Sequence, residues 1–329
     1  MNTPNTRVSP EASIVVVSFN TRELLRRSLL AIGDAARDVD HEIIVVDNHS
    51  HDGSADMVRR EFPDVRLLQA PHNLGFAAAN NLARQAAQGE FIVLINPDAF
   101  PEAGALRKGI DRMQAEREVA LAGGLLIGKN GQAEPSARCF PSPLNDFLAI
   151  SGLAARFPAS RLFGRFDRTW ADRNQPAEVD WVPGAFCLIR RAVIDQLGFF
   201  DERFFLYYEE VDLCRRLRQA GHRIAYWPDL RAVHWGGESS KTVTDQKISG
   251  HGRQLTLWRM RSALLYYRKH HGWLTAALAA AVEMGWHSLR RRHNRQNPEK
   301  AAESGSIVAN MRRAWQETLG GRVSPPSPW

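Results

Sequence analysis

The chain has 329 residues, of which 44% are hydrophobic and 24% charged, and its net charge is +7. This length accommodates one large α/β domain and a further segment, and the ordinary composition excludes collagen, a coiled coil and a wholly disordered protein. The charge is uneven, because residues 241–329 contain 15 basic and 5 acidic side chains, whereas residues 1–240 contain 28 basic and 31 acidic ones. A nucleic-acid-binding surface spread over the whole protein is therefore not expected.

The three cysteines lie far apart and have no spacing typical of metal ligands. We therefore expect neither a disulfide framework nor a zinc site. The protein is expected to occupy a reducing compartment. The first residues are polar and lack the apolar segment of a signal peptide. The longest apolar stretch, residues 273–289, is interrupted by Glu283 and His287 and is too short and polar to predict a membrane span. These features predict a cytoplasmic protein.

Buried β-branched runs alternate with helical patterns in the first part of the chain. Runs without polar alternation predict strands buried on both faces, and apolar residues three or four apart predict helices. In chain order we expect strands at 13–19, 42–46, 65–68 and 91–95, separated by helices at 24–32, 54–62 and 77–87. This alternation predicts βαβ units in a doubly wound sheet, with ligands at the carboxyl ends of the strands.

The pattern is less regular after residue 120. A strand is expected at 120–127, and the segment 128–173 is rich in Pro, Gly, Ser and Arg, which predicts a long loop over a site. Further elements are a helix at 191–197, a helix that starts at Phe204 and ends before Gly221, and a strand at 223–227. From Gln246 onward the pattern is helical.

These patterns divide the chain into four parts. Residues 1–12 are expected to be a disordered N-terminus and residues 13–250 the α/β domain. Residues 251–318 are expected to form a helical, basic and amphipathic C-terminal region, and residues 319–329 a disordered Pro-rich tail.

An acidic cluster, Glu209, Glu210 and Asp212, follows the aromatic run 204–208. Carboxylates crowded beside aromatic surface repel one another and lose solvent, which raises a pKa into the range of a general base. Acidic residues in the first turn of a helix also simply complement the helix dipole. The local sequence leaves both interpretations open.

Polar residues at strand ends are further candidates. Asp98 follows a buried strand, where its carboxylate suits Mg²⁺ or Mn²⁺ bridging a diphosphate, although the local sequence by itself favours a turn or helix cap. Asp47 and Asn48 end another strand and are placed to bind a ribose or base, or merely to begin a polar loop. His234 precedes two glycines and is a candidate metal ligand. The chain lacks GxGxxG after the first strand, a P-loop, GxSxG and HExxH, which argues against a dehydrogenase, an NTPase, an α/β-hydrolase and a zinc protease.

Six motifs occur in an order that resembles a known family. They are Val-Ser-Phe-Asn at 17–20, Val-Val-Asp-Asn-His-Ser-His-Asp-Gly-Ser at 45–54, Asn-Leu-Gly-Phe-Ala-Ala-Ala-Asn at 73–80, Ile-Asn-Pro-Asp at 95–98, Trp-Val-Pro-Gly-Ala at 181–185 and Phe-Leu-Tyr-Tyr-Glu-Glu-Val-Asp-Leu at 205–213. Together, over residues 13–272, they resemble the family 2 glycosyltransferases of GT-A fold, in particular the bacterial rhamnosyltransferase-like branch. The resemblance implies a Rossmann-like mixed sheet and a helical basic extension.

The resemblance also implies roles for individual residues. Asp98 and His234 would hold a divalent cation, Mg²⁺ or Mn²⁺, and Asn96 stands where the DxD-type motif has its first carboxylate, so fewer carboxylates compensate the metal. The nucleotide-sugar donor would be bound by Ser18, Asn20, Asp47, Asn48, Asn73, Gly75, Phe76, Asn80, Asn96, Asp98, Gly184 and Ala185. Glu210 stands at the position of the catalytic base, with Asp212 and Glu209 as alternatives, in an inverting displacement.

The basic C-terminal region contains tryptophans and tyrosines around an Ala/Leu-rich segment, which suggests contact with an anionic membrane surface. The alternatives are helices that pack on the domain or form a homodimer. The interpretation as a whole is a transferase at the inner face of the cytoplasmic membrane. It would move L-rhamnose from dTDP-rhamnose onto a cell-surface polysaccharide or a polyprenyl-diphosphate-linked glycan. Other donors (galactofuranose, mannose or glucose) and a non-catalytic sugar-nucleotide-binding scaffold are the alternatives, and no nucleic-acid partner is expected.

Overall fold

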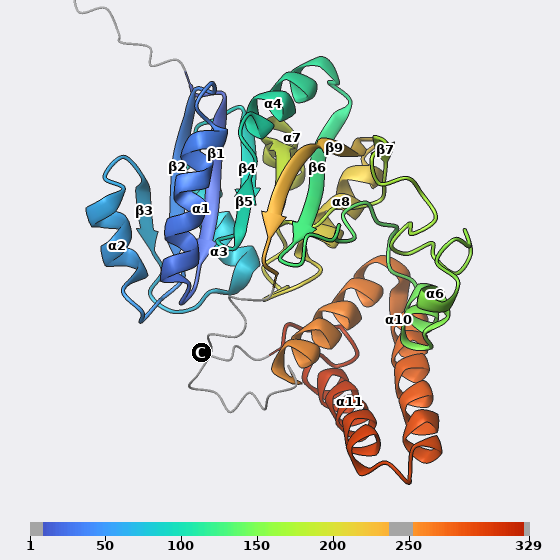
Figure 1. The fold of residues 1–329 in the computed structure, drawn as a ribbon. Coiled ribbons are helices and arrows are strands. Elements are labelled where there is room, and N and C mark those ends of the chain that lie inside the picture. The colour runs from blue at the N-terminus through green and yellow to red at the C-terminus, as the bar shows by residue number, and fades with distance from the viewer. Residues whose placement is uncertain (1–8, 237–252, 326–329) are drawn as a thin grey trace, which may run out of the picture.

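The computed structural model describes residues 9–236 and 253–325 (Figure 1). The strands in this part of the chain are β1 (Ala12–Ser18), β2 (His41–Asp47), β3 (Arg66–Gln69), β4 (Phe91–Ile95), β5 (Ala99–Pro101), β6 (Val119–Gly128), β7 (Ala177–Glu178), β8 (Phe186–Arg190) and β9 (Arg223–His234). The helices are α1 (Arg22–Ala35), α2 (Ser54–Glu61), α3 (Gly75–Ala86), α4 (Ala105–Ala115), α5 (Pro143–Ile150), α6 (Leu153–Arg156), α7 (Arg191–Leu197), α8 (Glu209–Gln219), α10 (Arg253–His293) and α11 (Pro298–Glu317).

The strands form one mixed sheet in the order β3-β2-β1-β4-β8-β6-β9-β5, and β7 pairs with β9. The first four strands are parallel, as predicted from their buried β-branched runs. β8 runs antiparallel between β4 and β6, and β6 is parallel to β9. The carboxyl ends of β1, β2, β4, β6 and β9 therefore lie at one edge, and in Figure 1 the arrowheads of β6 and β9 point toward the side where α10 and α11 lie.

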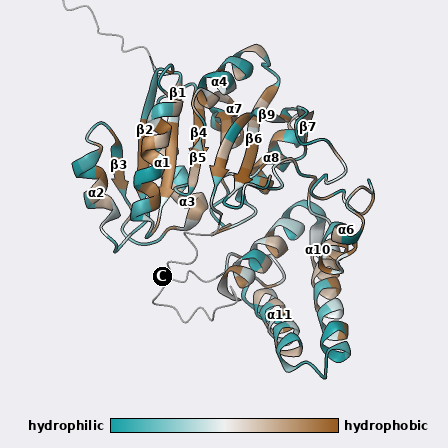
Figure 2. Ribbon diagram, viewed as in Figure 1, coloured by the Kyte–Doolittle hydropathy of each residue, from teal (hydrophilic) through white to brown (hydrophobic). Residues whose placement is uncertain are grey.

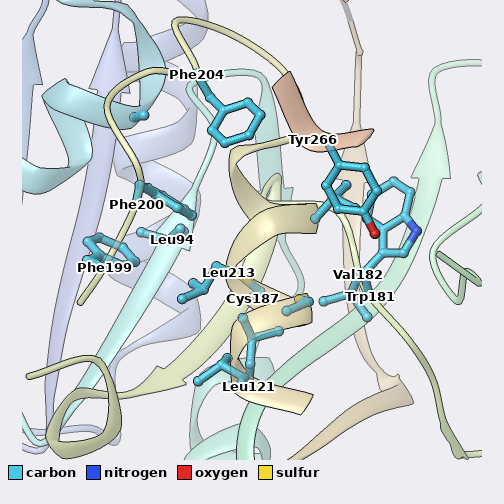
Figure 3. Packing of buried hydrophobic residues seen from close by; sticks show 14 of the residues in the cluster. Leu94, Leu121, Trp181, Val182, Cys187, Phe199, Phe200, Phe204, Leu213 and Tyr266 are labelled. Carbon is cyan, nitrogen blue, oxygen red and sulfur yellow. The ribbon is translucent and has the colours of Figure 1, made fainter. Parts of the chain in front are cut away.

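Helices cover both faces of the sheet, because the strands are apolar on both sides (Figure 2). One buried cluster joins the strands to α1, α2 and α4, and the other joins them to α3, α7 and α8. In the second cluster, Figure 3 shows Leu213 of α8 among the side chains that pack above β4 and β8. The same cluster continues into α10 and α11, so the C-terminal helices share a core with the α/β domain.

The C-terminal region packs on the domain, which was one of the sequence-based alternatives. α10 bends at Gly272, whose φ of 82° and ψ of 176° are not helical. Before the bend, Trp258 stacks on Phe205 with ring centroids 4.4 Å apart, and the hydroxyl of Ser262 donates a hydrogen bond to the Leu206 carbonyl (2.8 Å). No helix among the described residues is both long and apolar enough to cross a bilayer.

Three predicted internal segments have different bounds or content in the structure. The helix expected from Phe204 begins only at Glu209, and the strand expected at 223–227 continues to His234 because it pairs with β6 and β5. The loop expected at 128–173 contains α5 and α6.

Both chain ends depart from the predicted boundaries. β1 already begins at Ala12, which pairs with β2 and β4. Gly320 and Gly321 lie within the predicted disordered tail, yet both are buried, and the Gly320 N–H donates to the Trp315 carbonyl (2.9 Å). The remaining ends, 1–8 and 326–329, and the predicted domain boundary at 250 lie outside the described residues.

Candidate active site

The carboxyl ends of β1 and β2 form a small polar cradle. The Asn20 N–H donates to the Ser50 hydroxyl (3.0 Å), and the Asn20 side-chain oxygen accepts from the His51 N–H (2.8 Å). Asn20 has a φ of 52°, a left-handed conformation that asparagine tolerates better than most residues. Asp47 is 2% exposed, and its Oδ2 accepts from the Ser50 N–H (3.2 Å), whereas its Oδ1 is buried with no hydrogen-bond partner among the described residues. The cradle thus presents an unused carboxylate oxygen, which a ligand hydroxyl or N–H would satisfy.

Ser18 lies at the same strand end but is fully buried, and its hydroxyl is 2.8 Å from the Thr21 hydroxyl. The hydrogen bond between Ser18 and Thr21 holds the turn into α1. Of the residues predicted around the first two strands, Asn20 is partly exposed, whereas Asp47 and Ser18 are buried.

Asn48 and Asn73 hold the next loop together. The Asn48 amide donates to the Asn73 side-chain oxygen (2.9 Å) and its oxygen accepts from the Leu74 N–H (2.8 Å), while the same Asn73 oxygen accepts from the Gly75 N–H (2.9 Å). Both asparagines are buried. Both side-chain atoms of Asn48 and the side-chain oxygen of Asn73 bond to the protein, so in this structure they shape the loop before α3.

Gly75 connects this loop to the segment before α8. Its φ is 80°, and its missing side chain leaves room for Phe205, whose carbonyl accepts from the Phe76 N–H (2.8 Å). The Phe76 ring lies 3.7 Å from where a side chain on Gly184 would begin. Asn80 is buried and donates to the Phe76 carbonyl (2.9 Å), which fixes the first turn of α3.

Asp98 and His234 come together from β-strand ends that are distant in sequence. Asp98 is 3% exposed, and its Oδ1 lies 3.6 Å from His234 Nε2. The other ring nitrogen, Nδ1, lies 2.8 Å from Glu134 Oε2. Glu134 was missed in the sequence, since it lies 100 residues from its partner inside an irregular segment. Over residues 9–236 and 253–325, no three His, Cys, Asp or Glu side chains form a ready-made metal cluster.

A short path joins Asp98 to the acidic cluster. The Asn96 N–H donates to the Ala185 carbonyl (2.9 Å) at the end of β4. Gly184 is the preceding residue, and the Glu210 Cβ lies 3.9 Å from where a Gly184 side chain would begin. Asn96, Gly184 and Ala185 thus lie between the Asp98–His234 pair and Glu210.

Glu209 and Glu210 begin α8 in a strained setting. The two preceding residues, Tyr207 and Tyr208, both have a φ of 69°, which is uncommon for aromatic residues and is associated with functional sites. Burial raises the pKa of Glu209 well above its usual value, and the charge of Glu210 raises it further. Burial likewise raises the pKa of Glu210, although Arg138 and the N-terminal N–H groups of α8 oppose this increase. One oxygen of each carboxyl group is buried without a partner among the described residues.

The exposures of the two glutamates separate their roles. Glu209 is 4% exposed, whereas Glu210 is partly exposed and lines a cavity of about 420 Å³ between α8, α5 and the C-terminal helices. Of the two, Glu210 is the carboxyl group that an acceptor in the cavity can reach.

Asp212 lies on another side of α8 and is fully buried. It contacts Arg216 Nε at 2.9 Å, Lys269 Nζ at 2.6 Å and His270 Nε2 at 2.7 Å. Burial alone would raise the pKa of Asp212, but hydrogen bonds from His270 and Lys269 hold it below its usual value. The structure therefore does not bring this candidate base to the site, and its contacts instead attach α10 to α8.

Comparison with known proteins adds to this geometry. Residues 13–198 match the family model described as glycosyl transferase family 2. The chain belongs to this family. It is 27% identical over 280 residues to an N-acetylglucosaminyl-diphospho-decaprenol L-rhamnosyltransferase of Mycobacterium tuberculosis, covering 80% of this chain and 87% of the relative. It is 25% identical over 206 residues to the rhamnosyltransferase WbbL of Escherichia coli, covering 59% and 73%.

A solved structure of similar fold is the mannosyltransferase PcManGT from Pyrobaculum calidifontis, in complex with GDP-Man and Mn²⁺. It has a TM-score of 0.55 and 16% sequence identity, and the match covers 96% of this chain and 89% of that one. The fold of this chain is thus GT-A, as the resemblance in its motifs implied. The chain is a glycosyltransferase.

Proposed function

We propose that this glycosyltransferase is an inverting enzyme whose catalytic base is Glu210. The observation that carries the proposal is the position of Glu210, which lines the cavity beside Gly184 and has a raised pKa. A carboxylate of raised pKa is a stronger base than an exposed one, which suits removal of a proton from a sugar hydroxyl. Gly184 also connects through Ala185 to the strand end that bears Asp98, so donor and acceptor would meet at this point.

The reaction then follows from the two sides of the site. Glu210 takes the proton of the acceptor hydroxyl while its oxygen attacks the anomeric carbon of the donor. The bond from that carbon to the diphosphate breaks, and the nucleoside diphosphate leaves with the electron pair. The unpartnered carboxylate oxygen of Asp47 would accept a hydrogen bond from the base or ribose, and Asn20 is hydrogen-bonded to the same Ser50 as Asp47.

Asp98 and His234 fit a divalent cation. A carboxylate oxygen and an imidazole nitrogen suit Mn²⁺, and Mg²⁺ or Mn²⁺ commonly completes its coordination with substrate phosphates and water. Such a cation, when bound, would stabilise the charge of the departing diphosphate. Glu134 holds the His234 ring through Nδ1 and so directs Nε2 toward Asp98.

For the substrates, we propose L-rhamnose from dTDP-rhamnose as donor and a polyprenyl-diphosphate-linked glycan as acceptor. Support comes from the two relatives, whose names state rhamnosyl transfer and, for one, a diphospho-decaprenol acceptor. The decisive experiment is a panel of nucleotide-sugars (rhamnose, galactofuranose, mannose and glucose donors) scored for binding and hydrolysis with and without Mg²⁺ or Mn²⁺. Preferential binding and hydrolysis of dTDP-rhamnose would support the proposal. Preference for another donor would overturn the assignment of rhamnose as the transferred sugar. If none of the nucleotide-sugars bound, the proposed transfer reaction would be overturned.

A lipid-linked acceptor requires access to a membrane, and α10 has a surface suited to one. Beyond Gly272, its outer face exposes Leu274 (75%), Leu278 (55%) and Leu289 (66%). The sole charged residue between 272 and 289, Glu283, is turned inward and buried. Apolar helix faces are normally covered, and Arg290 to Arg292 continue this helix. Because each basic side chain near an anionic surface contributes about 1 kcal/mol, we propose that this face lies on the inner leaflet of the cytoplasmic membrane.

Vesicle binding tests the membrane contact. Leu274→Glu/Leu278→Glu should abolish sedimentation with vesicles containing phosphatidylglycerol, whereas Leu30→Glu, which alters an equally exposed leucine of α1 (59%), should not. Unchanged binding of the double variant would overturn the proposal. A wild-type dimer that the double variant dissociates would instead assign the face to a second copy.

A further inference from the structure

The cavity beside Glu210 is enclosed by parts of the chain that are far apart in sequence. The cavity has a volume of about 420 Å³. Its walls come from residues of the segment 128–173, which includes α5, from the start of α8, and from α10 and α11. Most of the wall that the C-terminal helices supply is apolar. Its apolar side chains are Met260, Ala263, Leu264, Ala279, Ala280 and Met311.

Two guanidinium groups line the cavity and differ in their contacts. Arg138 is engaged, because it forms an ion pair with Asp167 (2.5 Å) and its Cζ lies 4.4 Å from the centroid of the Phe166 ring. Arg259 is exposed, and it forms no ion pair or hydrogen bond with any residue in the described part of the chain. Arg259 therefore has its hydrogen-bond donors available to a ligand, and Arg138 has fewer.

Two carboxyl groups line the cavity together with Arg259, those of Asp146 and Glu283. The Tyr267 hydroxyl donates a hydrogen bond to Asp146 Oδ2 (2.5 Å). Burial raises the pKa of Asp146 to about 6 and raises that of Glu283. Neither carboxyl group forms an ion pair with Arg259 in the described part of the chain, so the guanidinium stays available to a ligand.

Glu210 and Arg259 act on different parts of the cavity. Arg138 lowers the pKa of Glu210, whereas Arg259 lowers those of Asp146 and Glu283. Tyr207 lines the same cavity as Glu210 and Arg259. A ligand that fills the cavity and places a hydroxyl at Glu210 would therefore also reach Arg259.

We propose that Arg259 binds the phosphate of the acceptor and that the apolar wall holds the adjoining part of its lipid chain. The ligand class is a prenyl chain that carries phosphate, and the sugar lies between Tyr207 and Glu210. Arg259 is then a positioning residue, which sets the distance between the acceptor hydroxyl and the base. A guanidinium is well suited to this task, since it binds phosphate oxygens through paired N–H groups. This inference rests on the proposed function and specifies its acceptor site.

Binding of short lipid probes to the full-length protein tests the proposal. Farnesyl diphosphate, farnesol and inorganic diphosphate would be titrated by calorimetry, with the donor site filled by the nucleoside diphosphate that binds best. The proposal predicts that farnesyl diphosphate binds at least tenfold more tightly than either other probe. Arg259→Ala should abolish its advantage over farnesol, and Arg259→Lys should restore part of it. Arg37→Ala, an exposed arginine far from the cavity after α1, should behave as wild type.

A second variant tests the apolar wall. Ala280→Phe should fill the cavity and weaken the binding of both farnesyl probes. If Arg259→Ala retained the full preference for farnesyl diphosphate, the assignment of Arg259 would be overturned. If inorganic diphosphate bound with the same affinity as farnesyl diphosphate, the assignment of the apolar wall to the lipid chain would be overturned. If the wild-type protein bound no nucleotide-sugar, the proposed transfer reaction itself would fail. Failure of the acceptor site and failure of the proposed function are therefore distinguishable.

Discussion

The contact between Gly75 and Phe205 gives a quantitative test of how the site is assembled. An alanine Cβ at position 75 would overlap the Phe205 carbonyl oxygen and lie 2.6 Å from ring atom Cδ2, whereas carbon atoms normally approach to about 3.5–4.0 Å. The same carbonyl accepts the Phe76 N–H at 2.8 Å. Gly75→Ala must therefore displace Phe205, two residues before the strained pair Tyr207 and Tyr208.

The magnitude has two parts. A non-glycine residue in the left-handed region costs about 1–2 kcal/mol, and loss of a buried backbone hydrogen bond adds about 1–3 kcal/mol. Gly131 isolates the first part, because its φ is 76° and no atom lies within 4 Å of an added Cβ. We therefore expect Gly131→Ala to lower the free energy of unfolding by about 1–2 kcal/mol and Gly75→Ala by about 2–5 kcal/mol.

Urea unfolding and donor-to-acceptor transfer measure the two consequences. Gly75→Ala should also slow transfer by about tenfold or more, since the segment that carries Glu210 shifts, whereas Gly131→Ala should not. Equal stability losses in the two variants, or normal transfer by a folded Gly75→Ala protein, would refute the reasoning.

Three further perturbations follow from the structure. Burial raises the pKa of Asp146 from 3.8 to about 6, so the native state loses stability as pH rises through that interval, by at most about 3 kcal/mol. Urea unfolding between about pH 4 and pH 8 should show this loss in the wild type relative to Asp146→Asn, and a pH-independent difference would contradict it. Arg138 lowers the pKa of Glu210, so Arg138→Gln should move the acidic limb of the profile of kcat/KM against pH to higher pH. Arg138→Lys keeps the charge and should leave the limb in place. Coincident profiles for Arg138→Gln and the wild type would refute the coupling. Glu134→Gln should weaken Mn²⁺ binding by about 10–100-fold, as measured by calorimetry with nucleoside diphosphate present, and unchanged affinity would show that Glu134 does not orient His234.

Much of the fold was predictable because its signals are local. The strands that end at Ser18, Asp47 and Ile95 are continuous apolar runs, and such runs identify buried parallel strands without any tertiary information. The start of α8 was not predictable in this way. Residues 204–208 have the composition of an apolar helix turn, but Tyr207 and Tyr208 adopt left-handed conformations, and the Tyr208 ring contacts Tyr266, which is distant in sequence.

The candidate site was predictable in its residues more than in their partners. Asp98 follows the predicted strand end, whereas His234 ends a strand that was expected to stop at residue 227, and Glu210 lies in the first turn of a helix that was expected to begin at Phe204. Glu134 was not found, because it meets His234 across 100 residues. The exclusion of Asp212 depends on Lys269 and His270 from α10, whose packing on α8 has no local sequence signal. The cavity was missed for the same reason, since its walls come from α5, α8, α10 and α11.

The central claim is that Glu210 is the base of a glycosyl transfer, and Glu210→Gln tests it most directly. Glutamine keeps the size of the side chain but cannot take up the proton. With the preferred nucleotide-sugar and its acceptor, the account predicts donor affinity within about twofold of wild type and a loss of turnover of about 10²–10⁴-fold. Unchanged turnover in the variant would contradict the account.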